Sequence, residues 1–283
     1  MPHFQVQTLL RTPLVGVLDV HCPGGEPHRG EAETSSRTHL VFPYRGSYVR
    51  HVGADAAVAD ASQVLLFNRG ERYRVSHPHP GADASLVLEL GEGLLRELAP
   101  PSLVDPGEPL RFRRQRLRID PRTQVLVALL RHSLREGRAE PLEGESLALV
   151  LAGRALGPRT AHEAGASPAR QRLVERSKLV LAGDLARRWT LAEIAGVVGV
   201  SPVYLTQSFR QVEGVPLYRY HLRLRLARAL DLLAEYEDLS ALAAELGFSS
   251  HSHFAASFQQ AYGRTPSDFR RHATGDRRLR RVR

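Results

Sequence analysis

The sequence holds a single cysteine, Cys22, and only one tryptophan and one lysine among 283 residues. One cysteine excludes a disulfide within the chain and a zinc site built from several thiolates. The chain lacks any run of about 18 consecutive apolar residues, which excludes a membrane-spanning helix. Its first residues do not combine a basic stretch, an apolar core and a small-residue cleavage site. We therefore expect a cytoplasmic protein without a signal peptide or a membrane partner.

Positive charge is distributed unevenly along an otherwise ordinary globular composition, with 42% hydrophobic and 24% charged residues. Residues 1–165 hold 20 Lys and Arg against 19 Asp and Glu, whereas residues 166–283 hold 19 against 11. The net charge of +9 therefore lies almost wholly in the last part of the chain. A basic region of this kind favours contact with a polyanion, although a solvated basic surface would have the same composition.

A change of composition marks a domain boundary at residues 157–169, where Gly, Pro, Ala and Ser are frequent and apolar periodicity is absent. We interpret this segment as a linker. Before it, short strand-like runs such as 64–67 alternate with turn signals that contain glycine. This pattern predicts a small antiparallel barrel or sandwich, followed by helices at 123–134 and 146–156. Those helices either cover the sheet or form a dimer contact.

An internal repeat in the basic region is the strongest signal of the sequence. At an offset of 48 residues, four pairs match: Leu191 with Leu239, Ala195 with Ala243, Gly199 with Gly247, and Ser201 with Ser249. After one inserted residue the offset is 49, and four more pairs match: Ser208 with Ser257, Phe209 with Phe258, Gln211 with Gln260, and Gly214 with Gly263. Two copies of one small helical unit are therefore expected.

Each copy has the pattern of a helix-turn-helix. In the first copy, a short amphipathic helix at 191–198 precedes Gly199, where the turn requires a positive φ. Ser201 then caps a second helix at 202–211, whose buried side would carry Leu205 and Phe209. The second copy repeats this logic with Gly247, with Ser249 or Ser250 as the cap, and with Phe254 and Phe258 as the buried pair.

The exposed face of the second helix in each copy suits the major groove of DNA. Gln207 can pair with adenine, Thr206 can contact a thymine methyl group, and Arg210 can reach guanine or a phosphate. Backbone amides and hydroxyls at Ser201 and Ser249 suit phosphate oxygens. A plain helical bundle with incidental polar residues is the alternative, and a duplicated unit in a basic region disfavours it.

The connection between the two copies is apolar at helical spacing over residues 217–235. A helix of these nineteen residues would be about 28 Å long. One turn of B-DNA is about 34–36 Å, so a rigid helix of that length would place two recognition helices in successive major grooves.

This arrangement resembles the AraC/XylS family of transcription regulators over roughly residues 170–271. The most specific runs are ELGFSS at 245–250 and YGRTPSDFRR at 262–271. The resemblance implies promoter double-stranded DNA and RNA polymerase as partners, and usually activation of transcription. Together with the helix starts, it gives these predicted DNA-binding residues: Ser201, Val203, Thr206, Gln207, Arg210, Ser249, Ser250, His251, Ser252, His253 and Ala256. Because Ala256 stands where many members carry a long polar side chain, we expect the first unit to dominate recognition.

The N-terminal half resembles the cupin-like sensor domains that many such regulators carry. The resemblance implies an α+β protein of two domains: a cupin-like β-barrel with flanking helices at 1–156, the linker 157–169, an all-α DNA-binding domain with two helix-turn-helix units at 170–273, and a basic tail at 274–283. It also implies a small-molecule effector of unknown identity and a homodimer. The aromatic and basic side chains that could line an effector pocket, or belong to the ordinary core and surface, are Phe42, Tyr44, Arg45, Tyr48, Arg50, Phe67, Tyr73 and Arg74.

The N-terminal half offers only weak motifs for metal binding or catalysis. His77 and His79 with Asp83 are similar to a cupin metal motif, but an Asp replaces the Glu and two prolines favour a turn. A second loose cluster is formed by His21, Cys22, His28 and His39. We expect no cofactor, no metal and no enzymatic activity. The alternative hypothesis is a cupin-type metalloenzyme or metal sensor fused to a DNA-binding module.

Overall fold

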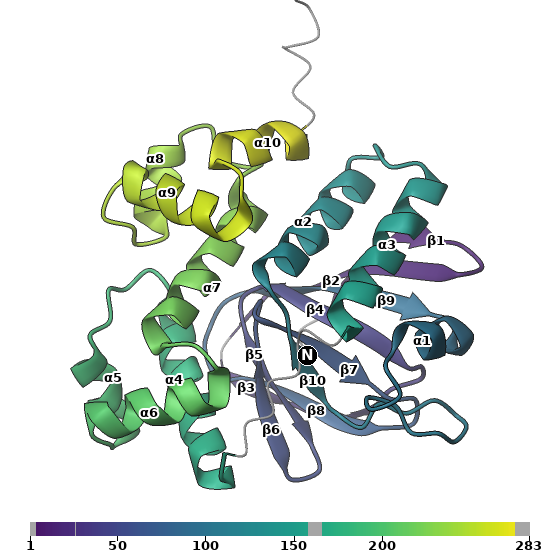
Figure 1. Ribbon diagram of the computed structural model, residues 1–283, viewed down its shortest axis with the longest axis horizontal. Helices are drawn as coiled ribbons and strands as arrows, with labels where there is room; N and C mark the ends of the chain where they lie inside the picture. Colours follow the sequence, from purple (N-terminus) through teal and green to yellow (C-terminus); the bar gives the residue numbers. More distant parts are fainter. Residues whose placement is uncertain (1–3, 26, 158–165, 275–283) are drawn as a thin grey trace, which may run out of the picture.

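The computed structural model describes residues 4–25, 27–157 and 166–274. A sheet-rich N-terminal region lies beside a helical C-terminal region, and the long helix α7 runs along the boundary between them (Figure 1). This is the mixed two-part architecture expected from the sequence. Most of the predicted linker 157–169 and nearly all of the predicted tail 274–283 lie outside the described residues.

The strands of the described ranges form two antiparallel sheets. The larger sheet has the order β1-β2-β9-β4-β7-β10 and the smaller one has the order β3-β8-β5-β6. The strands are β1 Gln5–Arg11, β2 Val15–Cys22, β3 His28–Thr34, β4 His39–Arg45, β5 Tyr48–Val52, β6 Asp55–Ala59, β7 Gln63–Phe67, β8 Arg72–His77, β9 Asp83–Leu90 and β10 Arg116–Arg118. Among the described strands the two sheets are not hydrogen-bonded into one ring, so the predicted closed barrel is not confirmed and the sandwich alternative describes them.

The larger sheet is buried on both faces, because alternate residues of its strands enter two different cores. Leu40 and Phe42 of β4 pack in a core with the N-terminal helices. Val41 of the same strand and Val87 of β9 pack with Tyr48 of β5 in a second core, between the two sheets. The runs of apolar residues in the sequence reflect this burial on both faces.

Three helices accompany the sheets: α1 Glu92–Leu98, α2 Pro121–Arg135 and α3 Pro141–Leu156. Asp120 caps α2 by accepting a hydrogen bond from the Thr123 amide. Residues of α2 and α3 belong to the core of the larger sheet, so these helices cover that sheet. The opposite side of α2 contributes Ala128 to a core of the C-terminal region. The sequence allows this helix either to cover the sheet or to form a dimer contact. In the structure α2 covers the sheet and also joins it to the helical region.

The C-terminal region contains α4 Pro168–Gly183, α5 Leu191–Val198, α6 Pro202–Glu213, α7 Leu217–Leu232, α8 Leu239–Glu245, α9 His251–Tyr262 and α10 Pro266–Thr274. Helix α7 ends at Leu232, three residues before the predicted end at 235. The chain then turns toward α8, and Arg270 donates hydrogen bonds to the carbonyls of Tyr236 and Glu237. The 16 residues of α7 make a helix of about 24 Å, shorter than predicted. Among the described residues, the helices are all too short or too polar to cross a bilayer.

Candidate nucleic-acid interface

The first helix-turn-helix unit consists of α5 and α6. Thr190 and Glu193 form a reciprocal capping box at the start of α5. Hydrogen bonds from Thr190 lower the pKa of Glu193 to about 2, which keeps this carboxylate charged. Leu205 and Phe209 of α6 are fully buried, as their spacing of four residues predicts. They pack with Ala195, the small residue of α5, in one core.

The second unit consists of α8 and α9 and repeats the first closely. Asp238 caps α8 by accepting a hydrogen bond from the Ser240 amide. Phe254 and Phe258 of α9 are fully buried, like the pair in α6. The centroids of their rings are 5.8 Å apart, and the rings are arranged edge to face. Helices α6 and α9 both have 12 residues and both end at a left-handed glycine. The structure therefore confirms the duplication inferred from the sequence.

The turns of the two units differ in how tightly they are enclosed. Gly199 has φ +72° and Gly247 has φ +76°, the left-handed conformation predicted for both. A Cβ at Gly199 would find no atom within 4 Å, whereas at Gly247 it would lie 1.9 Å from the carbonyl oxygen of Ala186. Gly199 is thus required for its backbone conformation alone, and Gly247 also for a close approach of two backbones.

The predicted base-contacting side chains of both units lie on the surface. Those of α6 are exposed: Val203, Thr206, Gln207 and Arg210. Those of α9 are exposed as well: His251, Ser252, His253 and Ala256. Val203, an apolar side chain, is 67% exposed. An apolar residue among polar ones on an open helix face suits contact with a thymine methyl group.

The three serines at the starts of α6 and α9 are also exposed, and their hydroxyls have local partners. Ser201 accepts a hydrogen bond from the Tyr204 amide at 3.2 Å. Ser250 accepts one from the His253 amide at 3.1 Å, which makes Ser250 the N-cap of α9. Ser249 Oγ lies 3.1 Å from Nδ1 of the His253 ring. A phosphate at these helix starts would therefore contact free backbone amides of the first turn as well as hydroxyls.

Sequence reasoning missed Arg225 of α7, which joins the loop before α5 to the turn of the second unit through backbone carbonyls. Its guanidinium donates to the carbonyls of Leu185 and Ala186 before α5, each at 2.8 Å. It also donates at 3.2 Å to the carbonyl of Gly247, in the turn of the second unit. A signal for this role is absent from the local pattern, because arginine on a helix is ordinarily a solvated residue.

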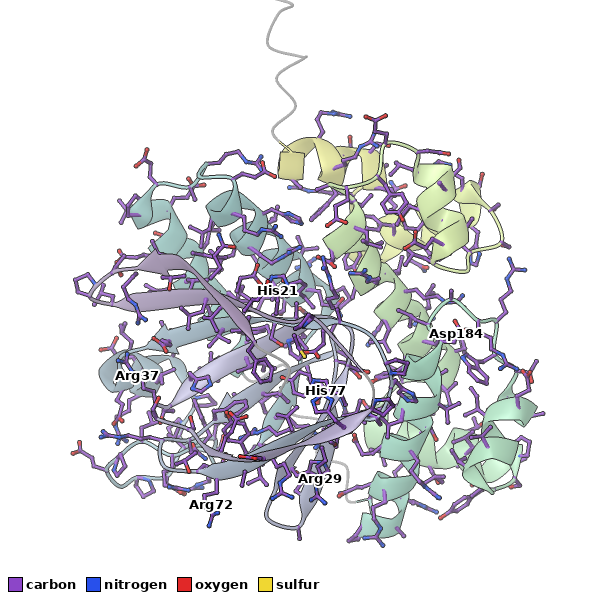
Figure 2. The ribbon with its side chains drawn as sticks, turned by 180° about the vertical axis from the view of Figure 1, so that it is seen from behind. His21, Arg29, Arg37, Arg72, His77 and Asp184 are labelled. Atoms are coloured by element: carbon purple, nitrogen blue, oxygen red, sulfur yellow. The ribbon has the colours of Figure 1, made fainter. Side chains whose placement is uncertain are left out.

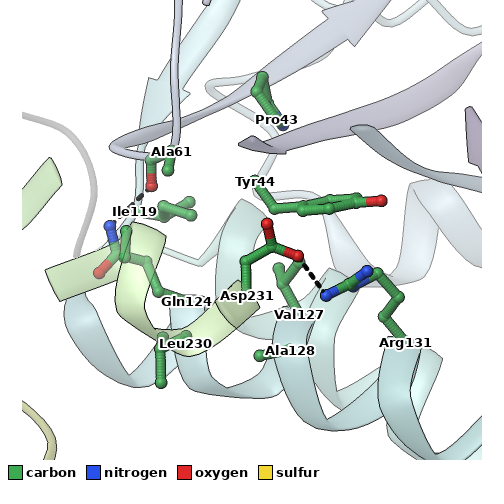
Figure 3. A pocket seen from close by; sticks show the side chains of 11 residues that line it. Pro43, Tyr44, Ala61, Ile119, Gln124, Val127, Ala128, Arg131, Leu230 and Asp231 are labelled. Atoms are coloured by element: carbon green, nitrogen blue, oxygen red, sulfur yellow. Dashed lines mark hydrogen bonds and ion pairs between the residues drawn. The ribbon is translucent and has the colours of Figure 1, made fainter. Parts of the chain in front are cut away.

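A second group that sequence reasoning missed holds the helical region against the sheet region. Asp231 of α7 is buried, and Arg45 of β4 contacts it through Nε at 2.8 Å. Arg131 of α2 reaches the same carboxylate at 2.6 Å, beside the ring of Tyr44 (Figure 3). Arg228 of α7 forms a third ion pair with it. Desolvation raises the pKa of Asp231, but the hydrogen bond from Arg45 and the three positive charges outweigh it and lower the pKa overall.

A further buried ionic cluster joins the two regions near α4. The single lysine, Lys178 of α4, pairs with Glu213 at the end of α6 at 2.7 Å. Arg118 of β10 contacts the same carboxylate at 2.9 Å. Tyr220 of α7 donates a hydrogen bond to Asp60, which follows β6. Desolvation lowers the pKa of Lys178, but the carboxylates around it outweigh this effect and hold the pKa above its ordinary value.

The structure places the candidate effector-lining residues in separate parts of the molecule. Phe42 and Tyr44 lie in the core between the larger sheet and the helices. Tyr48, Phe67 and Tyr73 lie between the two sheets. Of the arginines, Arg50 is buried against Glu71 at 2.5 Å, Arg45 binds Asp231, and Arg74 is half-buried on β8.

The structure also separates the histidines of the weak metal motif. Nε2 of His77 lies 2.8 Å from Oδ2 of Asp83, and both side chains are buried. A Cβ at Gly183, the last residue of α4, would lie 3.2 Å from the ring of His79. Cys22 lies with His77 and Asp83, whereas His21 contacts Tyr44 and His39 stacks on Phe67.

Comparisons with known proteins agree with the helical geometry. Residues 194–272 match a family model described as "Helix-turn-helix domain". The probable transcriptional regulator LumQ of Photobacterium leiognathi is 25% identical over 250 residues, which cover 85% of this chain and 95% of LumQ. A putative AraC-like transcription regulator of Streptomyces lividans is 33% identical over 92 residues, covering 32% of this chain and 30% of that protein. The regulator GadX of Escherichia coli is 33% identical over 91 residues, covering 32% of this chain and 33% of GadX.

Two solved structures show more distant likeness. An AraC-type regulator from Chromobacterium violaceum is 26% identical, covers 39% of this chain and 99% of its own, and has a TM-score of 0.36. ToxT from Vibrio cholerae with a bound unsaturated fatty acid is 14% identical, covers 93% of this chain and 97% of its own, and has a TM-score of 0.35. Both TM-scores are too low to define a shared fold. The sequence matches and the two observed units show instead that residues 194–272 form a helix-turn-helix domain similar to that of AraC-like transcription regulators.

Proposed function

We propose that this protein binds promoter DNA with both helix-turn-helix units, α6 and α9 entering successive major grooves on one face of the duplex. The observation that carries the proposal is the duplicated unit with an exposed recognition face on each copy. Helix α7 joins the copies, and Arg225 fixes the loop before α5 and the turn of the second unit to it. The basic composition of residues 166–283 supports contact with phosphates.

Base recognition is assigned mainly to α6. Its exposed face offers a long amide at Gln207 and a guanidinium at Arg210, whereas Ala256 of α9 offers only a methyl group. The hydroxyl of Thr206 donates to the carbonyl of Pro202 at 2.9 Å, which leaves its methyl group and an oxygen lone pair for a base. Selection of sequences from a random DNA pool tests the assignment. We expect a motif whose strongest positions belong to one half-site, and recovery of no motif would contradict sequence-specific binding.

The interface between the sheet region and the helical region supports control by a small-molecule effector. A cavity of about 340 Å³ lies there. The turn at Arg45, Gly46 and Ser47 lines one side, and Leu224 and Arg228 of α7 line the other. A ligand in this cavity would contact both regions, so it can favour one arrangement over another. A ligand screen by thermal shift, followed by DNA binding with each hit, tests this assignment. Hits that leave DNA affinity unchanged would contradict it.

The family resemblance supports activation through RNA polymerase and action in the cytoplasm, without an enzymatic step. A homodimer is supported by the outer face of α3, where Leu142 is 74% and Val150 is 56% exposed. Light scattering tests the dimer: we expect Leu142→Glu with Val150→Glu to give a monomer. A wild-type monomer at micromolar concentration would contradict the proposal.

A further inference from the structure

Three side chains with metal-binding atoms meet at one end of the sandwich. Cys22 ends β2 and Asp83 begins β9, and the two residues are partners in the larger sheet. His77 ends β8 of the smaller sheet. Figure 2 shows His77 on the side of the sandwich next to the helical region, while Arg29 and Arg72 project away from the smaller sheet. Sequence positions 22, 77 and 83 are thus brought together only by the pairing and packing of the sheets.

The potential ligand atoms of these residues lie close to one another. One atom from each of Cys22, His77 and Asp83 lies within 4.8 Å of the other two. Nε2 of His77 and Oδ2 of Asp83 form an ion pair at 2.8 Å, but this contact does not have the geometry of a hydrogen bond. Two ligands of a tetrahedral zinc ion would be separated by about 3.3 Å, since each lies about 2.0–2.1 Å from the metal. The two atoms therefore lie about 0.5 Å closer together than two ligands of a shared tetrahedral ion.

Burial makes charged and polar atoms without well-formed hydrogen bonds costly. The exposed fractions are 1% for Cys22, 5% for His77 and 7% for Asp83. Buried polar atoms ordinarily have partners, and an ionised carboxylate away from water requires one. The ring of His28 stacks on that of His77 at 4.7 Å, which fixes the plane of the imidazole. The site therefore combines buried metal-ligating atoms with a fixed orientation of the His77 ring.

We propose that Cys22, His77 and Asp83 bind a divalent transition-metal ion of the zinc class. A set of thiolate, imidazole and carboxylate ligands suits Zn²⁺ and leaves a fourth position open. Binding replaces the thiol proton of Cys22, which leaves to solvent as the sulfur–metal bond forms. The ion ties β2 and β9 of the larger sheet to β8 of the smaller sheet. It is a site separate from both recognition helices and goes beyond the DNA-binding function.

The structure distinguishes this set of ligands from the motif formed by His77, His79 and Asp83. The ring of His79 approaches Gly183 at the end of α4 and does not belong to the cluster. His79 is therefore a matched control: it is a histidine two positions from a ligand, in the same segment of the chain.

The test is titration of the metal-stripped full-length protein with Co²⁺ and Zn²⁺. Absorption spectra follow Co²⁺, and native mass spectrometry counts Zn²⁺. We expect one ion per chain and a cobalt spectrum with a thiolate charge-transfer band, which reports Cys22 without any variant. His77→Gln and Asp83→Asn should weaken binding by about 100-fold or more, whereas His79→Gln should bind like the wild type.

Several outcomes would overturn the proposal. These are a folded wild-type protein that takes up no ion, a cobalt spectrum without the thiolate band, or equal loss of binding in His79→Gln. Circular dichroism of each variant separates lost binding from lost folding. If the variants do not fold, the stoichiometry and the thiolate band of the wild type alone decide.

Discussion

Gln207 is the single side chain on which base recognition by α6 depends most. Its amide is exposed and can form two hydrogen bonds with an adenine edge. Gln207→Ala should weaken binding to the selected DNA by about 1–3 kcal/mol and relax preference at one base position. Fluorescence anisotropy with matched and mismatched duplexes measures both effects. Gln7→Ala, at an exposed glutamine on β1, is the control, and equal behaviour of the two variants would refute the assignment.

His132 of α2 makes the stability of the folded state depend on pH. Desolvation first, and the charge of Arg131 second, lower its pKa from 6.5 to about 4. Between pH 6.5 and pH 4 the imidazole is therefore protonated in the unfolded chain but neutral in the folded chain. This contribution to stability is complete above pH 6.5 and is lost as pH falls toward 4. Denaturant unfolding at pH 7 and pH 5 should show a loss of about 2 kcal/mol from this group. His132→Gln should reduce that loss, and an unchanged loss would exclude His132 as its source.

Residues whose roles are local could be predicted from the sequence, and residues with distant partners could not. Ser201 and Gly199 act within one or two turns of a helix, so spacing alone reveals them. Arg45 and Asp231 form an ion pair across 186 positions, and neither residue carries a local sign of that contact. Arg225 was missed for the same reason, because its partners are carbonyl groups and every residue has one.

At the scale of elements, the turns of the two units permit a matched comparison. Gly199→Ala should lower the free energy of unfolding only through the left-handed backbone conformation, which costs about 1–2 kcal/mol. Ala at position 247 would also displace the Ala186 carbonyl that Arg225 holds. Gly247→Ala should therefore destabilise the domain by roughly 4 kcal/mol or more, well beyond Gly199→Ala. Thermal unfolding measures both variants. Equal losses of stability would show that the close approach at position 247 does not contribute to stability.

The helices of the two helix-turn-helix units were predictable as elements because each follows a capping side chain and buries apolar residues at helical spacing. The predicted 191–198 coincides with α5. The sheets were predictable only in kind, because β2 pairs with β9 and β4 pairs with both β9 and β7. Such pairings join segments far apart in the sequence, which contains no local record of strand order. For this reason the strand pattern alone fits a barrel and a sandwich equally, and the cupin-like barrel implied by the family resemblance is not confirmed.

At the scale of the whole molecule, Asp231 links the sheet region to the DNA-binding region. Asp231→Asn would leave three arginines around a neutral amide, two of them from the sheet region. Loss of one partner from a buried ionic group costs about 3–5 kcal/mol. Hydrogen exchange should therefore become faster in both α2 and α7. Asp105→Asn removes an exposed pair with Arg113 and should change little. Unchanged exchange in Asp231→Asn would show that this group does not hold the regions together.

Binding of two successive major grooves by one chain is the central claim, and hydroxyl-radical footprinting of the full-length protein on its selected DNA tests it most directly. We predict two protected patches on one face of the duplex, about 10 base pairs apart, which is one turn of B-DNA. The patch that covers the stronger half-site should be the one that weakens in Gln207→Ala. A single protected patch, or even protection along the whole duplex, would contradict the assignment of α6 and α9 to successive grooves.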